Sequence, residues 1–232
     1  DYFIESRVPS RPSTSTASMA SSKPYKILFL HGKGENRSMF AQRVARIESA
    51  LGDSRPVECE YLSAPILIEG KDKFAWWKLP RNERSFTATE YIGIENSFEL
   101  IESTWKSKGP FDCIVGHSQG AILTSILLAR ALVEDYPIKP EKAILMGAAW
   151  PQPFDKLVSS IAVLKLDKVP YCPRTLHVFA LNDKVNPAEM ALKIKNLLGH
   201  QAEALIHENG HDIPMDEDCL DRYRRFLFEE AV

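Results

Sequence analysis

Residues 116–120, Gly-His-Ser-Gln-Gly, stand between a mostly apolar run at 111–115 and a helix-like run at 121–133. A serine placed after a strand and before a helix in this pattern is typical of a nucleophile elbow, a sharp turn that strains the serine backbone. The two glycines leave room where side chains would collide. The turn also puts the backbone N–H of Gln119 at the positive end of a helix, where a negatively charged oxygen is stabilised. This stretch therefore predicts a strand–turn–helix unit that presents Ser118.

Outward from this unit, strands and helices alternate along the chain. Strands are expected at 25–30, 57–62, 111–115, 143–146, 175–181 and 204–207, and helices at 39–51, 94–105, 119–134, 187–198 and 215–229. This alternation indicates a mainly parallel sheet with helices on both faces. The sequence thus predicts an α/β fold, a three-layer sandwich, in one domain spanning residues 24–232 without internal repeats.

The bulk composition bounds the class of protein. The chain has 232 residues, 44 % of them hydrophobic, and a net charge of −2. There is no basic excess that would indicate nucleic acid or an anionic membrane surface as a partner. The apolar stretches are shorter than the ~20 residues that a membrane span needs. We expect a soluble protein with a small-molecule partner, and the sequence leaves its oligomeric state open.

The cysteines and the first residues bear on the compartment. The four cysteines are scattered, with no metal-binding spacing, which argues against structural zinc and suits a reducing compartment such as the cytoplasm. Residues 6–23 contain seven serines, two arginines and no acidic residue. We therefore expect a disordered leader at 1–23. It is either a plain leader, with Met19 as an internal start, or the remnant of a transit peptide for organelle import.

A reactive serine needs a base, usually histidine, which is in turn oriented by a carboxylate. In α/β-hydrolases these groups follow in the order Ser, Asp, His, each just after a strand. Asp183 follows the strand expected at 175–181, and His211 follows the last strand and precedes the last helix. Asp183 also suits a plain turn or helix cap, and Asp212 is a weaker rival for the acid role. The order favours Ser118, Asp183 and His211 as the reacting set.

A second backbone N–H is needed beside that of Gln119 to hold an oxyanion. The loop 31–34, His-Gly-Lys-Gly, follows the first strand and allows close approach, so we assign this donor to the N–H of Lys33. The alternative is a phosphate-binding loop, but this stretch of sequence lacks the glycine spacings that such loops require.

Five motifs together resemble a known family: LFLHGKGEN (28–36), AWW (75–77), GPFDCIVGHSQGA (109–121), ALNDKVNP (180–187) and ENGHDIP (208–214). They are similar to the small enzymes called the family of serine hydrolases, which includes yeast members and an ovarian-cancer-associated human relative. The resemblance covers roughly residues 25–230. The chain departs from the family at Lys33, where an apolar residue is usual, and at His117, where phenylalanine is at least as frequent.

The resemblance implies an α/β-hydrolase fold, a Ser118–Asp183–His211 catalytic triad, and esterase or thioesterase activity on short- to medium-chain acyl groups. The proposed acyl transfer to water requires no cofactor. Acyl-protein-thioesterase-like enzymes share the same motifs and stay an alternative. So do a lyase or acyltransferase with the same triad, and a non-catalytic ligand-binding protein on this scaffold.

Two segments are expected to form the walls of the substrate site: the aromatic-rich stretch 63–92 and the stretch 150–173, which contains several prolines. Four apolar side chains are the expected substrate contacts: Trp76, Trp77, Trp150 and Ile213. The competing interpretation is that these side chains serve packing. The apolar character of both segments favours acyl chains over sugars or charged peptides.

Overall fold

The structure is a computed structural model that describes residues 23–229. The predicted leader at 1–23 therefore lies outside the described residues, apart from Lys23.

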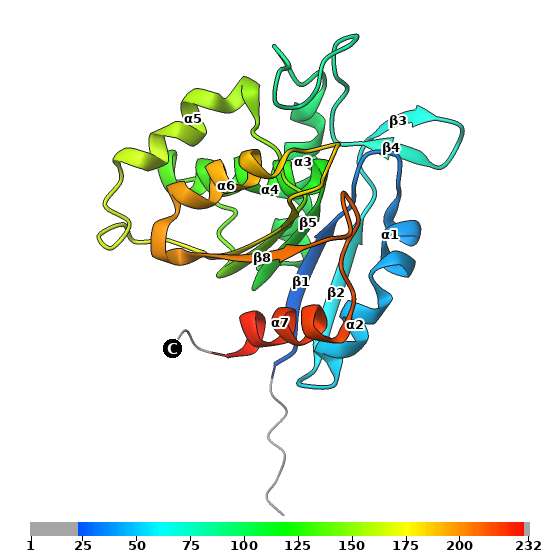
Figure 1. The fold of residues 1–232 in the computed structure, drawn as a ribbon, viewed down its shortest axis with the longest axis vertical. Coiled ribbons are helices and arrows are strands. Elements are labelled where there is room, and N and C mark those ends of the chain that lie inside the picture. The colour runs from blue at the N-terminus through cyan, green and yellow to red at the C-terminus, as the bar shows by residue number, and fades with distance from the viewer. Residues whose placement is uncertain (1–22, 230–232) are drawn as a thin grey trace, which may run out of the picture.

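A six-stranded sheet forms the centre of the molecule (Figure 1). All neighbouring strands in it are parallel, and their order is β2-β1-β5-β6-β7-β8. The strands are β1 (Tyr25–Leu30), β2 (Val57–Leu62), β5 (Cys113–His117), β6 (Lys142–Met146), β7 (Arg174–Ala180) and β8 (Ala202–His207). The predicted parallel sheet is confirmed. Because parallel strands end at the same edge, the loops after β1, β5, β7 and β8 meet there.

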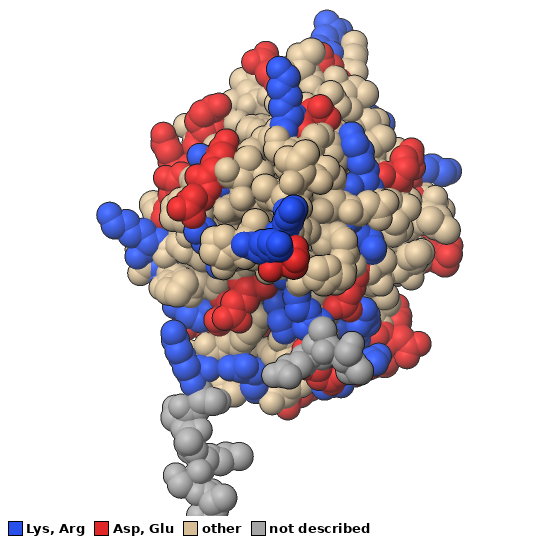
Figure 2. All heavy atoms as spheres, turned by 90° about the vertical axis from the view of Figure 1, so that its left-hand side faces the viewer, with Lys and Arg blue, Asp and Glu red and all other residues tan. Residues whose placement is uncertain are grey.

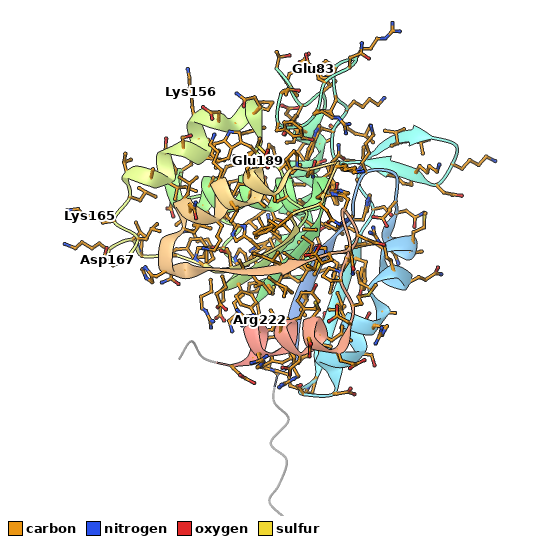
Figure 3. The ribbon with its side chains drawn as sticks, in the orientation of Figure 1. Glu83, Lys156, Lys165, Asp167, Glu189 and Arg222 are labelled. Atoms are coloured by element: carbon orange, nitrogen blue, oxygen red, sulfur yellow. The ribbon has the colours of Figure 1, made fainter. Side chains whose placement is uncertain are left out.

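Helices cover both faces of the sheet, as the nearly continuous burial of its central strands requires. Ile27 and Phe29 of β1 pack on one side with α1 (Arg37–Arg43), α2 (Ala45–Gly52) and α7 (Glu217–Phe228). Leu28 and Leu30 pack on the other side with α3 (Ile94–Lys108) and α4 (Gln119–Val133), and α6 (Ala188–Leu197) lies on that side too. Glu189 on α6 and Arg222 on α7 mark the two layers in Figure 3. The three-layer α/β sandwich is thus confirmed.

Three regions differ from the expectation. The helix expected at 39–51 is interrupted at Val44, so it forms α1 and α2; no proline or glycine marks the break. The stretch 63–92 contains a two-stranded hairpin, β3 (Ile66–Glu69) and β4 (Lys73–Ala75). Short helical turns occupy part of 150–173, with α5 (Asp155–Ser159) between η1 (Gln152–Phe154) and η2 (Ser160–Val163), and η3 (Gly199–Gln201) precedes β8.

The surface carries both signs of charge. On the face shown in Figure 2, basic and acidic side chains are interspersed rather than gathered by sign. Among residues 23–229, none of the helices is long and apolar enough to cross a membrane.

Candidate active site

The backbone at Ser118 has the strained geometry expected of a nucleophile elbow. Its φ of 52° and ψ of −115° lie outside the common regions, between the end of β5 and the start of α4. A Cβ on Gly116 would lie 2.5 Å from the Gly120 carbonyl oxygen, and a Cβ on Gly120 would lie 2.1 Å from the Leu30 carbonyl oxygen. Since backbone surrounds both positions, only glycine fits at either one.

His211 connects Ser118 to Asp183. Its Nε2 lies 2.9 Å from Ser118 Oγ, and its Nδ1 lies 2.7 Å from Asp183 Oδ2. An ionised carboxylate only accepts hydrogen bonds, so Nδ1 donates and Nε2 is left to accept the serine proton. The other oxygen of Asp183 accepts from the backbone N–H groups of Val185 and Asn186, at 2.7 and 3.0 Å. The carboxylate is therefore held in a tight turn and aimed at the imidazole.

The imidazole of His211 has its place because of a glycine at the end of β6. Gly147 has a φ of +60°, and a Cβ there would lie 3.1 Å from His211 Cε1. Asn186 donates from Nδ2 to the Gly147 carbonyl oxygen at 2.7 Å, which fixes this turn. Asp212 faces away from the imidazole: its carboxylate accepts from Arg43 at 2.5 Å. The structure thus brings Asp183, and not Asp212, to His211.

The two expected oxyanion donors lie at the same cavity as Ser118 and His211. Among residues 23–229, no group accepts a hydrogen bond from the backbone N–H of Lys33 or Gln119. The Gln119 side chain points away from the cavity, because it accepts from the backbone N–H of Trp76 at 3.0 Å and donates to the carbonyl of Trp77 at 3.2 Å. Both backbone N–H groups are therefore available to a ligand.

His31 shapes the loop that carries Lys33. Its Nε2 accepts from the backbone N–H of Ala64 at 2.9 Å, so its Nδ1 carries the proton and donates to the Gly32 carbonyl at 2.6 Å. Burial lowers the pKa of His31, which keeps the ring neutral in this role. Trp76 donates from Nε1 to the His31 carbonyl at 2.8 Å, so the loop is held from both sides.

A cavity of about 460 Å³ opens at Ser118. Its apolar lining comes from Leu79, Ile122 and Val185, and its charged lining from Lys33, Glu83 and Arg84. Glu83 lies on the segment between β4 and α3, at the upper end of the molecule in Figure 3. The cavity brings together Ser118, His211, the residues expected to supply the two oxyanion donors and an apolar wall, an arrangement that suits the cleavage of a carbonyl compound with an apolar part.

The sequence of the chain matches a family model. Residues 19–223 fit the model described as Serine hydrolase (FSH1). The chain belongs to the FSH1 serine hydrolase family. Esterase OVCA2 of Danio rerio is 27 % identical over 89 % of this FSH1-family chain and 98 % of its own length. Esterase CG5412 of Drosophila melanogaster is 26 % identical over 92 % of the chain and 78 % of its own length.

Solved structures of esterases share the fold of this FSH1-family chain. Esterase PE8 superposes with a TM-score of 0.63 at 20 % identity, covering 90 % of this chain and 94 % of its own. A carboxylesterase from Mesorhizobium loti gives a TM-score of 0.61 at 19 % identity, covering 90 % and 91 %. The fold is accordingly that of the α/β-hydrolases, as the resemblance implied.

The residues expected to contact substrate do not line the cavity at Ser118. Trp76 and Trp77 are fully buried, and Trp150 and Ile213 nearly so, each within a hydrophobic core. The hairpin β3–β4 turns the first two inward, where they support Gln119 and the His31 loop. These four side chains therefore pack in the hydrophobic cores and do not line this cavity, contrary to the prediction.

Several residues that line the cavity were not predicted, because the sequence indicates their position only weakly. Ile122 is four residues after Ser118 on α4, so helical spacing places it on the same face. Leu79 and Arg84 lie in 63–92, a segment correctly expected at the site. The other expected wall, 150–173, contributes instead to a separate hollow of about 570 Å³ with Thr87 and Thr89.

Proposed function

We propose that this FSH1-family hydrolase is a serine carboxylesterase in which Ser118 is the nucleophile, His211 the base and Asp183 its orienting acid. One observation carries the proposal: Ser118 Oγ, His211 and Asp183 form a continuous chain of hydrogen bonds of 2.9 and 2.7 Å at an open cavity. Such a chain serves nucleophilic acyl transfer, because the base removes the hydroxyl proton as the oxygen attacks.

In the proposed reaction, His211 takes the Ser118 proton while Oγ adds to the ester carbonyl. The oxygen that becomes negative is held by the backbone N–H groups of Lys33 and Gln119. Asp183 stabilises the imidazolium, which then gives its proton to the leaving alcohol. Water repeats the cycle on the acyl-enzyme and releases the acid and the free serine. Gln119 is the first residue of α4, so the positive end of the helix dipole would add to the stabilisation of this oxygen.

For the substrate, we propose short- to medium-chain acyl esters. Leu79, Ile122 and Val185 supply an apolar wall, and a cavity of about 460 Å³ suits an acyl group of modest length. Thioesters react by the same steps, so an acyl-protein-thioesterase-like activity is the second proposal. A series of acyl esters and matching thioesters of increasing length distinguishes the two by kcat/KM.

The proposal is tested with a fluorophosphonate probe, which labels an activated serine. We expect the wild type to be labelled and Ser118→Ala not to be. Ser85→Ala is the matched control and should keep the label, because Ser85 lines the same cavity but no histidine among residues 23–229 is hydrogen-bonded to its side chain. A folded wild type that stays unlabelled would support the ligand-binding alternative instead.

As its compartment we propose the cytoplasm, with organelle import as the alternative. The four cysteines, Cys59, Cys113, Cys172 and Cys219, are free, which supports a reducing compartment. A carboxyl-terminal fluorescent fusion that localised to an organelle would favour import.

A further inference from the structure

Behind the site, Arg43 at the end of α1 contacts three separate segments. Its guanidinium lies 3.0 Å from Glu35 Oε1, 2.5 Å from Asp212 Oδ1 and 3.3 Å from His117 Nδ1. Glu35 lies in the loop between β1 and α1, Asp212 is in the loop before α7, and His117 directly precedes Ser118. We call these four side chains the Arg43 cluster. They join the three segments that carry Ser118, His211 and the proposed oxyanion donor Lys33.

The cluster continues into the two loops through backbone groups. Glu35 Oε2 accepts from the backbone N–H of Gly32 at 3.0 Å, one residue before the proposed oxyanion donor Lys33. His117 Nε2 lies 3.1 Å from the carbonyl oxygen of His211, the proposed base. One guanidinium therefore connects, through one side chain each, to the loop of the oxyanion donor and to the loop of the base.

The protonation state of His117 fits this arrangement. A carbonyl oxygen only accepts, so His117 Nε2 donates to the His211 carbonyl and Nδ1 is left to accept from Arg43. Burial, together with the positive charge of Arg43, lowers the pKa of His117 to about 3. The ring is thus neutral and has a single tautomer that satisfies both contacts.

The sequence leaves space for the cluster at one glycine. A Cβ on Gly32 would lie 2.9 Å from His117 Nδ1 and 3.2 Å from Glu35 Oε2. The absence of a side chain at Gly32 lets the loop approach the cluster closely.

We propose that Arg43 is a positioning residue for the proposed hydrolysis. Its guanidinium holds the His211 loop and the Lys33 loop in register with Ser118, so that base and oxyanion donor face the same reacting carbonyl. The inference rests on the proposed function. A planar guanidinium is suited to this role because its rigid fork of N–H groups donates in fixed directions, whereas the three donors of an ammonium group rotate.

The first test compares Arg43→Ala with Arg46→Ala. Arg46 is a matched control, because it lies three residues further on and pairs with exposed Glu217 at 2.7 Å, away from the cavity. With kcat expressed per serine titrated by the fluorophosphonate probe, Arg43→Ala should lower kcat up to about 100-fold and change KM less than about threefold. Arg46→Ala should match the wild type.

Chemical rescue separates positioning from a general loss of structure. The Arg43 side chain is 28 % exposed, so a small cation can reach the space that Arg43→Ala leaves. Millimolar methylguanidinium should restore kcat severalfold in Arg43→Ala and leave Arg46→Ala unchanged, while methylammonium should restore less. A raised KM at unchanged kcat, or the absence of any rescue, would overturn the positioning role.

A second measurement does not depend on turnover. In the Ser118→Ala background, Arg43→Ala should speed amide hydrogen exchange in peptides covering 31–36 and 208–214, with little change in α3. Glu35→Gln, which retains the size of the side chain, should affect the 31–36 peptide more than the other. Unchanged exchange in both loops would refute the positioning role of Arg43, even if the fluorophosphonate probe labels Ser118 in the wild-type protein. Failure of the wild type to label would instead refute the proposed function.

Discussion

The elbow at 116–120 and the loop that carries His211 hold their reacting groups in different ways. The elbow is fixed by backbone: Ser118 N–H donates to the Met146 carbonyl at 2.8 Å, and Gly120 lies against the Leu30 carbonyl. The His211 loop is held by side chains from distant elements, among them Asp183 and His117. Backbone contacts leave little freedom for substitution, whereas side-chain contacts are adjusted one at a time. Ser118 is therefore positioned by local geometry and His211 by tertiary contacts.

The largest expected effect is on the base. Asp183→Asn should lower kcat for a p-nitrophenyl ester by about 10⁴-fold, because a neutral amide neither favours the correct imidazole tautomer nor stabilises the imidazolium. Asp212→Asn is the control, since this carboxylate pairs with Arg43, and it should cost less than about tenfold. Steady-state kinetics decide: a loss of less than about tenfold in Asp183→Asn would move the acid role to another carboxylate, with Asp212 tested first.

A substitution at a glycine of the elbow should lower the free energy of unfolding. Gly120→Ala places a Cβ against the Leu30 carbonyl in a rigid strand, and we expect a loss of about 3 kcal/mol in the free energy of unfolding. Gly52→Ala, where nothing lies within 4 Å of the added Cβ, should change it by less than about 1 kcal/mol. Urea denaturation measures both. Equal stability of the two variants would contradict the backbone account of the elbow.

Two buried histidines, His117 and His177 on β7, should make the stability of the protein fall in acid in the same way. Burial lowers the pKa of both to about 3, from an ordinary 6.5. Since the unfolded chain binds these protons first, stability is full above pH 6.5 and is lost as the pH falls towards 3. Each group contributes up to about 1.4 kcal/mol per pH unit.

His117→Phe and His177→Gln should each flatten this acid slope, as measured by urea denaturation at pH 4 to ~7. Of the two, His117→Phe alone should also lower kcat, because His117 contacts the His211 loop whereas His177 pairs with Thr175 on its own strand. An equal effect of both variants on kcat would show that the loop is not held through His117.

The smallest effect is expected at Lys33. Lys33→Met keeps the backbone N–H, so kcat for a neutral ester should stay within about threefold. Its side chain lines the cavity, so KM for an ester with an anionic group should rise about fivefold, equivalent to about 1 kcal/mol. Lys106→Met on α3 is the control. A large fall in kcat for the neutral ester would mean that the ammonium group itself takes part in the reaction.

Much of the architecture could be predicted because strands and helices leave local patterns of apolar residues and turn residues in the sequence. Strands β1 and β2 begin and end at the residues predicted from the sequence, and the helix after Ser118 starts directly at the elbow. The break at Val44 could not be predicted, since Phe40, Val44 and Ile47 continue one apolar helical stripe across it. The hairpin β3–β4 could not be predicted because its strands are short. For the same reason, the sequence did not predict that Trp76, which follows the hairpin, is buried.

The sequence by itself determined the order of strands and helices, the elbow with its two glycines, and the positions of Ser118, Asp183 and His211 after strand ends. These depend on periodicity and turn chemistry, which act over a few residues. Only the tertiary structure decided which aromatic side chains pack in the core, which residues line the cavity, and that Arg43 lies between Glu35, His117 and Asp212. Those contacts join residues up to 169 positions apart, and no local pattern encodes them.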